Sequence, residues 1–440
     1  MMQRSIEADL VQWKNQKNHM PLIVRGARQI GKSFVIEQFG RKHFEQVVTL
    51  NFELSPQLKT AFIDLDPHKI IQILELFVGA PIQPNQTLLF LDEIQECPEA
   101  IMALRYFKEK MPELHVIAAG SLLEFALQSK NFRMPVGRVQ YVHMKPLSFK
   151  EFLIAFEQHQ LKEFIENVTW ETEIPSLIHD KLLEYVRLYF FLGGMPAVIQ
   201  DYLDQHSLLS ARRIQTAILA TYRGDFGKYA NVAKHKYLEL LFMKAPEIIA
   251  QQFRYVDVAR DVQSRDLKDA LDNLSRAGLM TQVFSTNATG LPLRSLIHER
   301  RFKLLFLDIG LVSSAVQYEP QLMLDNQILA VNRGALTEQF VGQELLANQD
   351  CYVDAEVYYW SRDARGSTAE IDYIIQAGNQ IIPVEVKSGS TGQMKSLHLF
   401  MQERQSVLGV RVSALPLSRH LNIATIPFYL VSELQRLTTR

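Results

Sequence analysis

The sequence predicts a multidomain α/β protein. Its 440 residues are about three times the length of a typical domain, so two to four domains are expected. Over the first third of the chain, short β-rich runs alternate with helical patterns, which is typical of a parallel sheet covered by helices. The middle of the chain has apolar residues at helical spacing, and the last third again contains patterns typical of strands.

Composition narrows the class of protein. Hydrophobic residues make up 47% and charged residues 22% of the chain, as in ordinary globular proteins that bury large cores. The 47 Lys and Arg residues nearly balance the 48 Asp and Glu residues, which excludes a polycation that binds nucleic acid through its overall charge. The two cysteines, Cys97 and Cys351, form neither a disulfide framework nor a thiolate metal site, so a cytoplasmic location is expected.

No segment is expected to cross a membrane. Charged residues interrupt the apolar pattern at the N-terminus, which excludes a signal peptide there. The longest apolar stretch, residues 185–200, is broken by Arg187, a glycine pair and Pro196, so it is too short for a spanning helix.

Residues 1–148 are expected to form a nucleotide-binding core on a parallel sheet. The β-rich runs that predict this sheet are 22–24, 47–52, 87–91 and 115–119. The first run ends directly before Gly26-Ala27-Arg28-Gln29-Ile30-Gly31-Lys32-Ser33, which has the phosphate-loop pattern G-x-x-x-x-G-K-[ST]. In this pattern backbone N–H groups wrap the phosphates, the lysine reaches the β and γ oxygens, and the hydroxyl binds magnesium. All eight residues are therefore expected to bind ATP, with Mg²⁺ at Ser33.

Two carboxylates follow another strand of this core. The apolar run 87–91 leads directly into Asp92 and Glu93. The carboxyl ends of parallel strands meet at the edge where the phosphate loop lies, so Asp92 is expected to hold Mg²⁺ through water. Glu93 is expected to orient or polarise the attacking water, which favours hydrolysis over nucleotide binding alone. The alternative is a charged loop after a strand.

Further residues of the core are candidates for contact with the γ-phosphate. The run 115–119 leads into Gly120 and Ser121, which places a small polar group where a phosphate sensor would lie. An arginine can stabilise the charge of the transition state. Arg138 is the first candidate, ahead of Arg105 and Arg28, and we expect it to act across an interface in an oligomer. Each of these arginines also suits an ordinary surface ion pair.

Two further units are expected after the core. Residues 149–253 predict a helical lid or connector, in which Gly193 to Pro196 ends one helix and begins the next. Residues 254–332 contain a short helix, an amphipathic helix and two strands, an order that predicts a winged helix. The helix and the two strands are expected over 267–277, 280–285 and 302–307.

The expected recognition helix, taken over residues 264–277, has an ambiguous charge pattern. Its basic residues Arg265, Lys268 and Arg276 alternate with aspartates, whereas a helix that reads a DNA groove is usually more basic. Contact with DNA and docking of a protein partner both remain open. Residues 391–440 carry six Lys and Arg against two Glu, which suits either a phosphate channel or a solvated basic tail.

Residues 333–440 are expected to form a second α/β domain. A helix that carries Glu338 opens it, and strands are expected over 352–360, 370–376 and 380–387. Residues 377–379 predict a tight hairpin turn between the last two strands.

Three charged residues of this domain form the pattern D-x12-E-x-K. Glu385 and Lys387 are two residues apart and share a face of their strand, and the hairpin can bring Asp372 beside them. Two carboxylates can hold Mg²⁺, with Glu338 as an additional ligand, while Lys387 helps a water attack a phosphodiester. The alternative is a set of solvated charges on a fold that has lost nuclease activity.

These motifs together resemble the large group of bacterial and archaeal AAA-family ATPases that have a C-terminal restriction-endonuclease-like domain. The resemblance is carried by residues 25–33, 91–95, 119–121, 137–139, 146–149, 193–196 and 383–389. It implies, in chain order, a P-loop ATPase core, a helical lid, a winged helix and a PD-(D/E)xK-like fold. Ser33 in place of threonine is a neutral departure, and Ile371 stands where the namesake motif has proline.

Two functions follow as expectations. In the first, ATP hydrolysis at Lys32, Ser33, Asp92 and Glu93 licenses a DNA-acting nuclease at the C-terminus. In the second, the chain is an ATP-gated switch or scaffold, whose C-terminal units bind protein or nucleic acid without cleaving it. A homo-oligomer or a protein partner is compatible with both.

Overall fold

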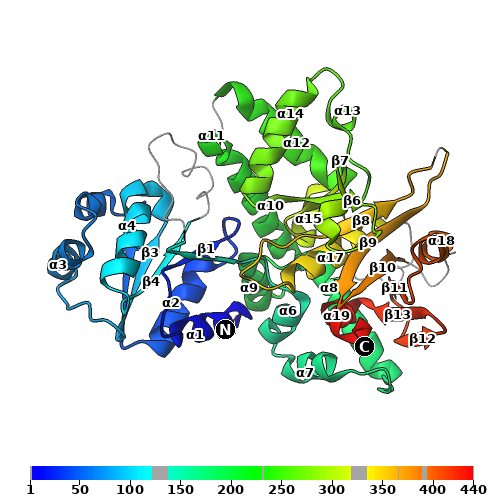
Figure 1. Cartoon of the computed structure of the whole chain (residues 1–440), viewed down its shortest axis with the longest axis horizontal. Helices are drawn as coiled ribbons and strands as arrows, with labels where there is room; N and C mark the ends of the chain where they lie inside the picture. Colours follow the sequence, from blue (N-terminus) through cyan, green and yellow to red (C-terminus); the bar gives the residue numbers. More distant parts are fainter. Residues whose placement is uncertain are drawn as a thin grey trace.

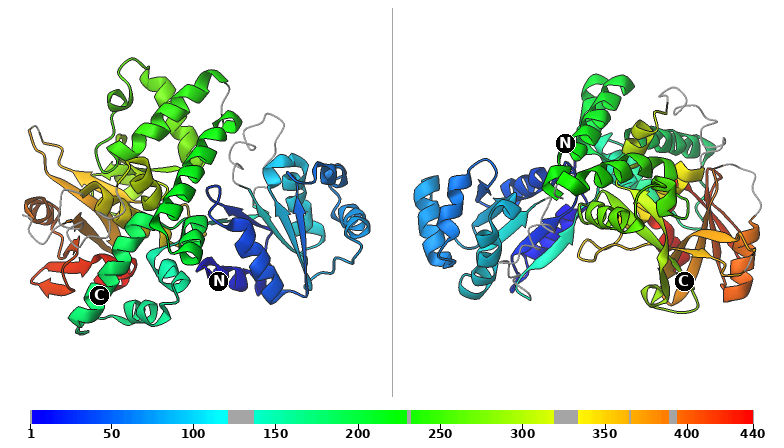
Figure 2. Two further views of the ribbon diagram at one scale, coloured as in Figure 1. Left: turned by 180° about the vertical axis from the view of Figure 1, so that it is seen from behind. Right: turned by 90° about the horizontal axis from the view of Figure 1, so that it is seen from above.

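The computed structural model describes residues 2–120, 137–229, 232–318, 334–364, 366–388 and 394–439. Two sheets organise this part of the chain (Figure 1). The smaller sheet belongs to the first third of the chain, and the larger sheet to the last third together with a hairpin from residues 280–306. Views from behind and from above keep the two sheets at opposite ends of the molecule, with green helices between them (Figure 2).

The first sheet has five parallel strands in the order β2-β3-β4-β1-β5. Their bounds are β1 (Leu22–Arg25), β2 (Gln46–Asn51), β3 (Thr87–Asp92), β4 (His115–Ala119) and β5 (Gln140–His143). Within β1, Leu22 and Val24 belong to one hydrophobic core and Ile23 to another, because helices cover both faces of such a sheet. The predicted parallel core is therefore confirmed.

Helices flank this sheet on both faces, and α3 has sequence signals at both of its ends. Helix α3 begins after Asp66, whose side chain accepts from the N–H of His68 at 3.2 Å, with Pro67 in the first turn, and it ends before Gly79 at a φ of 74°. The helices of this unit are α1 (Ile6–Lys14), α2 (Lys32–His43), η1 (Pro56–Phe62), α3 (Pro67–Val78), η2 (Ile94–Glu96) and α4 (Pro98–Lys110).

The segment expected to form a helical lid or connector is helical. Its helices are α6 (Phe149–Ala155), α7 (His159–Asn167), α8 (Ser176–Leu192), α9 (Pro196–Gln205), α10 (Leu208–Gly224), α11 (Phe226–Tyr229) and α12 (Val232–Ile248). A capping box starts α6, because Ser148 and Glu151 exchange side-chain-to-backbone hydrogen bonds. As predicted, the turn at Gly193 separates α8 from α9. There the N–H of Gly194 donates to Asp308 Oδ2 at 2.6 Å.

The second sheet has eight strands in the order β12-β13-β11-β10-β9-β8-β6-β7. Their bounds are β6 (Met280–Thr286), β7 (Ile297–Phe306), β8 (Tyr358–Ser361), β9 (Glu370–Ala377), β10 (Gln380–Val386), β11 (Gly409–Ser413), β12 (Ser418–His420) and β13 (Ile423–Pro427). The packed helices are α13 (Tyr255–Val258), α14 (Ser264–Arg276), η3 (Leu293–Leu296), α15 (Ile309–Ala315), α17 (Gly334–Ala347), α18 (Lys395–Arg404), η5 (Phe428–Glu433) and α19 (Leu434–Thr438).

The hairpin expected as the wing of a winged helix is shared with the C-terminal unit. The helix α14 and the antiparallel pair β6–β7 are present as predicted. However, β6 also pairs in parallel with β8, where Phe284 faces Tyr358. The hairpin thus completes one edge of the C-terminal sheet rather than forming a separate small sheet.

One predicted strand is much shorter than expected. The alternating pattern of 352–360 predicted a strand, but only Tyr358–Ser361 forms β8. The side chain of Asp350 accepts from the N–H of Tyr352 at 2.9 Å, and its carbonyl accepts from the N–H of Val353. This Asx-type turn satisfies the backbone locally and competes with strand pairing.

Among the described residues, no single helix is long and apolar enough to cross a membrane. Helices α8 and α9 have the necessary length and composition only when they are counted as one segment, and the chain bends by 114° between them.

Candidate functional site

The phosphate loop connects β1 to α2 in the way its sequence pattern requires. Gly31 precedes α2 with a φ of 89°, and Gly26 has a φ of 144°. A Cβ atom at Gly26 would lie 2.3 Å from the carbonyl oxygen of Met144. Only glycine fits at that position, because the φ angle and the close backbone both exclude a side chain.

Lys32 begins α2 and folds back over the loop. Its ammonium donates to the carbonyl oxygens of Gly26 at 3.0 Å and Ala27 at 2.7 Å. Burial lowers the pKa of Lys32 to about 8, against the raising effect of Glu93 and Asp92. The charge is held by neutral carbonyls, which phosphate oxygens can replace as partners.

Ser33 and Asp92 meet as the sequence predicts. Ser33 Oγ donates to Asp92 Oδ1 at 2.9 Å, and Asn51 Nδ2 donates to Asp92 Oδ2 at 3.0 Å. Burial raises the pKa of Asp92, while the hydrogen bond from Ser33 acts in the opposite direction. A hydroxyl and a carboxylate are oxygen ligands of the kind that Mg²⁺ prefers, so these residues fit the ion. The contact of Asn51, at the end of β2, with Asp92 was not predicted from the sequence. The available signal was that β2 and β3 belong to one parallel sheet, in which the ends of neighbouring strands lie at the same edge.

Glu93 has a left-handed backbone conformation, with a φ of 49°. Its Oε2 accepts from Gln95 Nε2 at 2.6 Å. Gln95 in turn lies against the end of β4, because a Cβ atom at Gly120 would be 2.2 Å from Gln95 Oε1. Gln95 therefore positions Glu93 between the ends of β3 and β4. The predicted sensor Ser121 lies outside the described residues.

Arg28 joins the loop to the helical segment, a contact that the sequence did not reveal. Its Nη1 donates to both carboxylate oxygens of Asp225, each at 2.7 Å. The hydroxyl of Tyr222, on α10, donates to the carbonyl of Arg28 at 2.7 Å. Although burial opposes the charge, the hydrogen bond and charge of Asp225 raise the pKa of Arg28. The phosphate loop is thus held by α10 and the residue that follows it.

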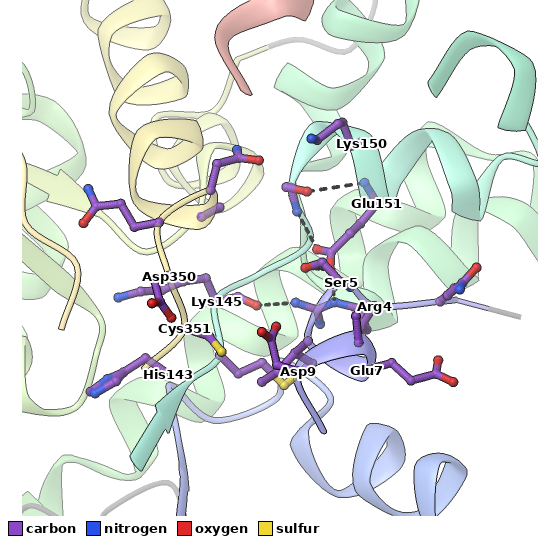
Figure 3. A pocket seen from close by; sticks show the side chains of 18 of the residues that line it. Arg4, Ser5, Glu7, Asp9, His143, Lys145, Lys150, Glu151, Asp350 and Cys351 are labelled. Carbon is purple, nitrogen blue, oxygen red and sulfur yellow. Dashed lines mark hydrogen bonds and ion pairs between the residues drawn. The ribbon is translucent and has the colours of Figure 1, made fainter. Parts of the chain in front are cut away.

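Arg4 supports the loop through the backbone of Ile30. Its guanidinium donates to the carbonyl of Ile30 at 3.0 Å, to that of Lys145 at 2.6 Å and to Glu151 Oε1 at 3.1 Å. Arg4, Lys145 and Glu151 border a cavity of about 970 Å³ that is also lined by residues of α1, α6 and 346–355 (Figure 3). Its lining mixes both signs of charge and contains no residue of 26–33.

Arg138 lies away from the phosphate loop of its own chain. It precedes β5, where Gln140 is in register with Leu22 at the amino end of β1, so Arg138 is at the opposite edge of the sheet. Both Arg138 and Arg105 bind Glu109 at 3.1 Å. A role for Arg138 in catalysis therefore requires the site of another copy of the chain.

A smaller cavity of about 360 Å³ lies beside the strand ends. Gly26, Gly120, Lys145 and Arg276 are among its lining residues. Arg276, on the helix for which contact with DNA and docking of a protein were both left open, thus lies near Gly26 of the phosphate loop. A Cβ atom at Gly278, just after this helix, would be 3.3 Å from the backbone nitrogen of Ala27.

The C-terminal hairpin has the predicted turn and register. Val384 pairs with Tyr373, and continuing this register sets Glu385 opposite Asp372. Lys387 Nζ donates to Glu385 Oε1 at 2.5 Å. Burial, followed by the charge of Asp372, raises the pKa of Glu385 to about 7. The structure therefore brings together the three residues of the D-x12-E-x-K pattern.

Lys303 lies among these carboxylates and was not singled out from the sequence. It contacts Glu338, the additional ligand expected, at 3.1 Å, and it also contacts Glu370 and Asp372. The described residues contain no group of three or more His, Cys, Asp or Glu that could hold a metal ion. The expected Mg²⁺ site of Asp372, Glu385 and Glu338 therefore does not fit. The sequence did contain a signal for this buried charge, because Lys303 interrupts the apolar run 302–306.

Comparison with protein families assigns the first unit. Residues 18–153 match the family model described as an AAA domain. Residues 183–322 and 333–421 match two models described as domains of unknown function, DUF8612 and DUF4143. No curated protein matches the chain. With its phosphate loop, the unit of residues 18–153 is an AAA-type P-loop ATPase domain.

Solved structures show distant likeness. The Walker-type ATPase PABY2304 of Pyrococcus abyssi is 14% identical, with 72% of this chain and 96% of that chain covered and a TM-score of 0.46. The Aeropyrum pernix ORC1 protein in complex with DNA is 10% identical, with coverage of 72% and 93% and a TM-score of 0.30. AMPPCP-bound DnaA from Aquifex aeolicus is 14% identical, with coverage of 61% and 86% and a TM-score of 0.25.

Proposed function

We propose that this chain hydrolyses ATP with Mg²⁺ at the edge of the five-stranded sheet. The observation that carries the proposal is that the phosphate loop, the Ser33–Asp92 pair and Glu93 meet at the carboxyl ends of β1 and β3. In this arrangement Lys32 binds the β and γ oxygens, and Ser33 and Asp92 hold the ion. Glu93, positioned by Gln95, polarises the attacking water.

We further propose that the nucleotide cycle acts on the helical segment. Arg28 belongs to the loop that wraps the phosphates, and its partner Asp225 follows α10. A nucleotide brings negative charge next to Arg28, which competes with Asp225 for the same guanidinium. Exchange of this partner would loosen α10 from the loop and convey the nucleotide state towards the second sheet.

The C-terminal unit has two proposed roles, of which the structure favours one. In the first, the hairpin cleaves DNA with Mg²⁺ when ATP licenses it. In the second, the unit is part of an ATP-gated switch or scaffold that binds a protein or nucleic acid. The ion pairs of Lys303 with Glu338, Glu370 and Asp372 favour the second role, because they fill the place that a catalytic metal would need.

The test is ATP hydrolysis by the purified chain with Mg²⁺, with and without single- and double-stranded DNA, while the DNA is followed on a gel. We expect turnover that Lys32→Ala abolishes, with ATP affinity lowered about 10- to 100-fold because a charge-assisted hydrogen bond is lost. The matched control is Lys42→Ala, which removes a lysine with a 58% exposed side chain from the same helix.

Three outcomes separate the proposals. Equal turnover of wild type and Lys32→Ala would contradict ATP hydrolysis at this loop. Turnover with cleaved DNA would support the nuclease role. Turnover with intact and unbound DNA would support a switch that acts on a protein partner.

A further inference from the structure

Lys303 is a buried charge that joins three separate elements. It lies on β7, and its side chain is only 5% exposed. Its Nζ is 3.1 Å from Glu338 Oε2 on α17, and 2.5 Å from Glu370 Oε1 and 3.8 Å from Asp372 Oδ1, both on β9. The contact with Glu338 is between residues 35 positions apart in sequence.

The surrounding charges keep this lysine protonated. A buried ammonium is costly unless it is paired. Burial lowers the pKa of Lys303, but the carboxylates of Glu338, Asp372 and Glu370 outweigh this effect and raise it above the ordinary value. The ring of Tyr359, whose centre lies 5.3 Å from Nζ, adds a favourable cation–π contact. The ammonium of Lys303 thus compensates the negative charge of the carboxylates that surround it.

A divalent ion does not fit beside this ammonium. Mg²⁺ requires oxygen ligands at about 2.0–2.1 Å in near-octahedral geometry. Glu338 and Asp372 each direct one oxygen to Lys303, and the other oxygen of Asp372 accepts from the N–H of Val386 at 2.7 Å. A divalent ion would also be repelled by an ammonium in contact with the same carboxylates.

Glu385 does not supply a metal site by itself. One of its oxygens accepts from Lys387 at 2.5 Å, and the other, Oε2, is buried without a hydrogen-bond partner among the described residues. This oxygen is a single carboxylate ligand, whereas protein sites for Mg²⁺ usually add a second carboxylate or substrate phosphates to the waters of the ion. The remaining carboxylates of the cluster already face Lys303.

We infer that Lys303 is a built-in cation that takes the place of a divalent metal in this cluster, so that the C-terminal sheet does not cleave nucleic acid by metal-dependent chemistry. The cluster instead fastens the hairpin β6–β7 to α17 and β9. The inference is independent of ATP hydrolysis, which takes place at the other sheet.

The test measures Mn²⁺ binding to the full chain without nucleotide, from the electron paramagnetic resonance signal of free Mn²⁺. We expect the wild type to bind no Mn²⁺ at the cluster. Lys303→Ala should gain a bound ion and a melting temperature that rises with Mn²⁺, and adding Asp372→Asn should remove both gains. Lys387→Ala is the matched control, because it removes a lysine from the cluster but leaves Lys303 in place.

Three results would overturn the inference. One is wild-type Mn²⁺ binding that Asp372→Asn removes and Asp92→Asn does not. Another is Mn²⁺-dependent nicking of a plasmid by the wild type that Asp372→Asn abolishes. The third is a folded Lys303→Ala that binds no Mn²⁺. If Lys303→Ala does not fold, the two wild-type measurements decide the question, and ATP turnover measured in parallel shows separately whether the ATPase proposal stands.

Discussion

The phosphate loop and the C-terminal carboxylate cluster use the same residue types in opposite ways. At the loop, Lys32 donates to two backbone carbonyls, and the carboxylate of Asp92 accepts from a hydroxyl and an amide. In the cluster, the ammonium of Lys303 is held directly by the carboxylates of Glu338 and Glu370. The first site keeps the ammonium of Lys32 off its carboxylates, and the second pairs the ammonium of Lys303 with them.

This difference explains which site is suited to ligands. Phosphate can replace neutral carbonyls around Lys32, and a metal ion can approach Asp92, without breaking a charge pair. Separating a buried ammonium from its carboxylates leaves uncompensated charges, which costs several kcal/mol.

The largest expected effect tests whether Glu93 activates water at the phosphate-loop site. Glu93→Gln should lower the rate of ATP hydrolysis about 10²- to 10⁴-fold, because the amide cannot accept a proton from water, while ATP affinity stays near the wild-type value. Phosphate release and binding of a fluorescent ATP analogue measure the two effects. Glu96→Gln, in the same short segment but with a 44% exposed side chain, serves as the control. Wild-type turnover of Glu93→Gln would show that another group activates the water.

The second prediction breaks the cluster. Lys303→Met should lower the free energy of unfolding by about 3–5 kcal/mol, because it leaves buried carboxylates without their partner. Lys387→Met should lower the free energy of unfolding by less than Lys303→Met does, because Lys387 is more exposed and contacts one carboxylate rather than three. Chemical denaturation measures both. Equal effects of the two substitutions would mean that Lys303 is not the central charge of the cluster.

The third prediction concerns the pH dependence of nucleotide binding. The pKa of Lys32 is lowered to about 8 by burial, so the free protein loses this ammonium as the pH rises through 8. A bound phosphate favours the charged form and raises the pKa again. ATP affinity should therefore be constant near pH 7 and fall towards about tenfold per unit above pH 8. Lys32→Arg, which stays charged, should remove this dependence, and a flat wild-type titration to pH 9.5 would contradict the assignment.

The smallest expected effect tests the contact between the loop and α10. A double-mutant cycle of Arg28→Ala and Asp225→Ala should give a coupling energy of about 1–3 kcal/mol without nucleotide, because the pair is hydrogen-bonded and largely buried. Saturating ATP should reduce this coupling if the nucleotide competes for Arg28. An unchanged coupling would exclude Arg28 as the link between nucleotide and helices. Thermal denaturation with and without ATP supplies the values.

Several features could be predicted because they depend on neighbours in the sequence. The glycines of the loop, the β3 carboxylates and the hairpin turn after Ala377 are encoded within a few residues. The strand over 352–360 was overestimated because its alternation does not reveal the competing turn at Asp350. Asn51 was missed because its role depends on which strands lie side by side, and Gln95 was missed because its bond to Glu93 depends on the left-handed backbone at Glu93.

By itself the sequence determined the phosphate loop, the parallel core and the D-x12-E-x-K hairpin, since backbone geometry and side-chain periodicity are local. The tertiary structure decided that β6–β7 joins the C-terminal sheet, that Arg28 binds Asp225, and that Lys303 enters the carboxylate cluster. These contacts join residues far apart in the chain. Their pairing depends on sheet order and on the need to neutralise buried charge, and neither is encoded by the spacing of nearby residues.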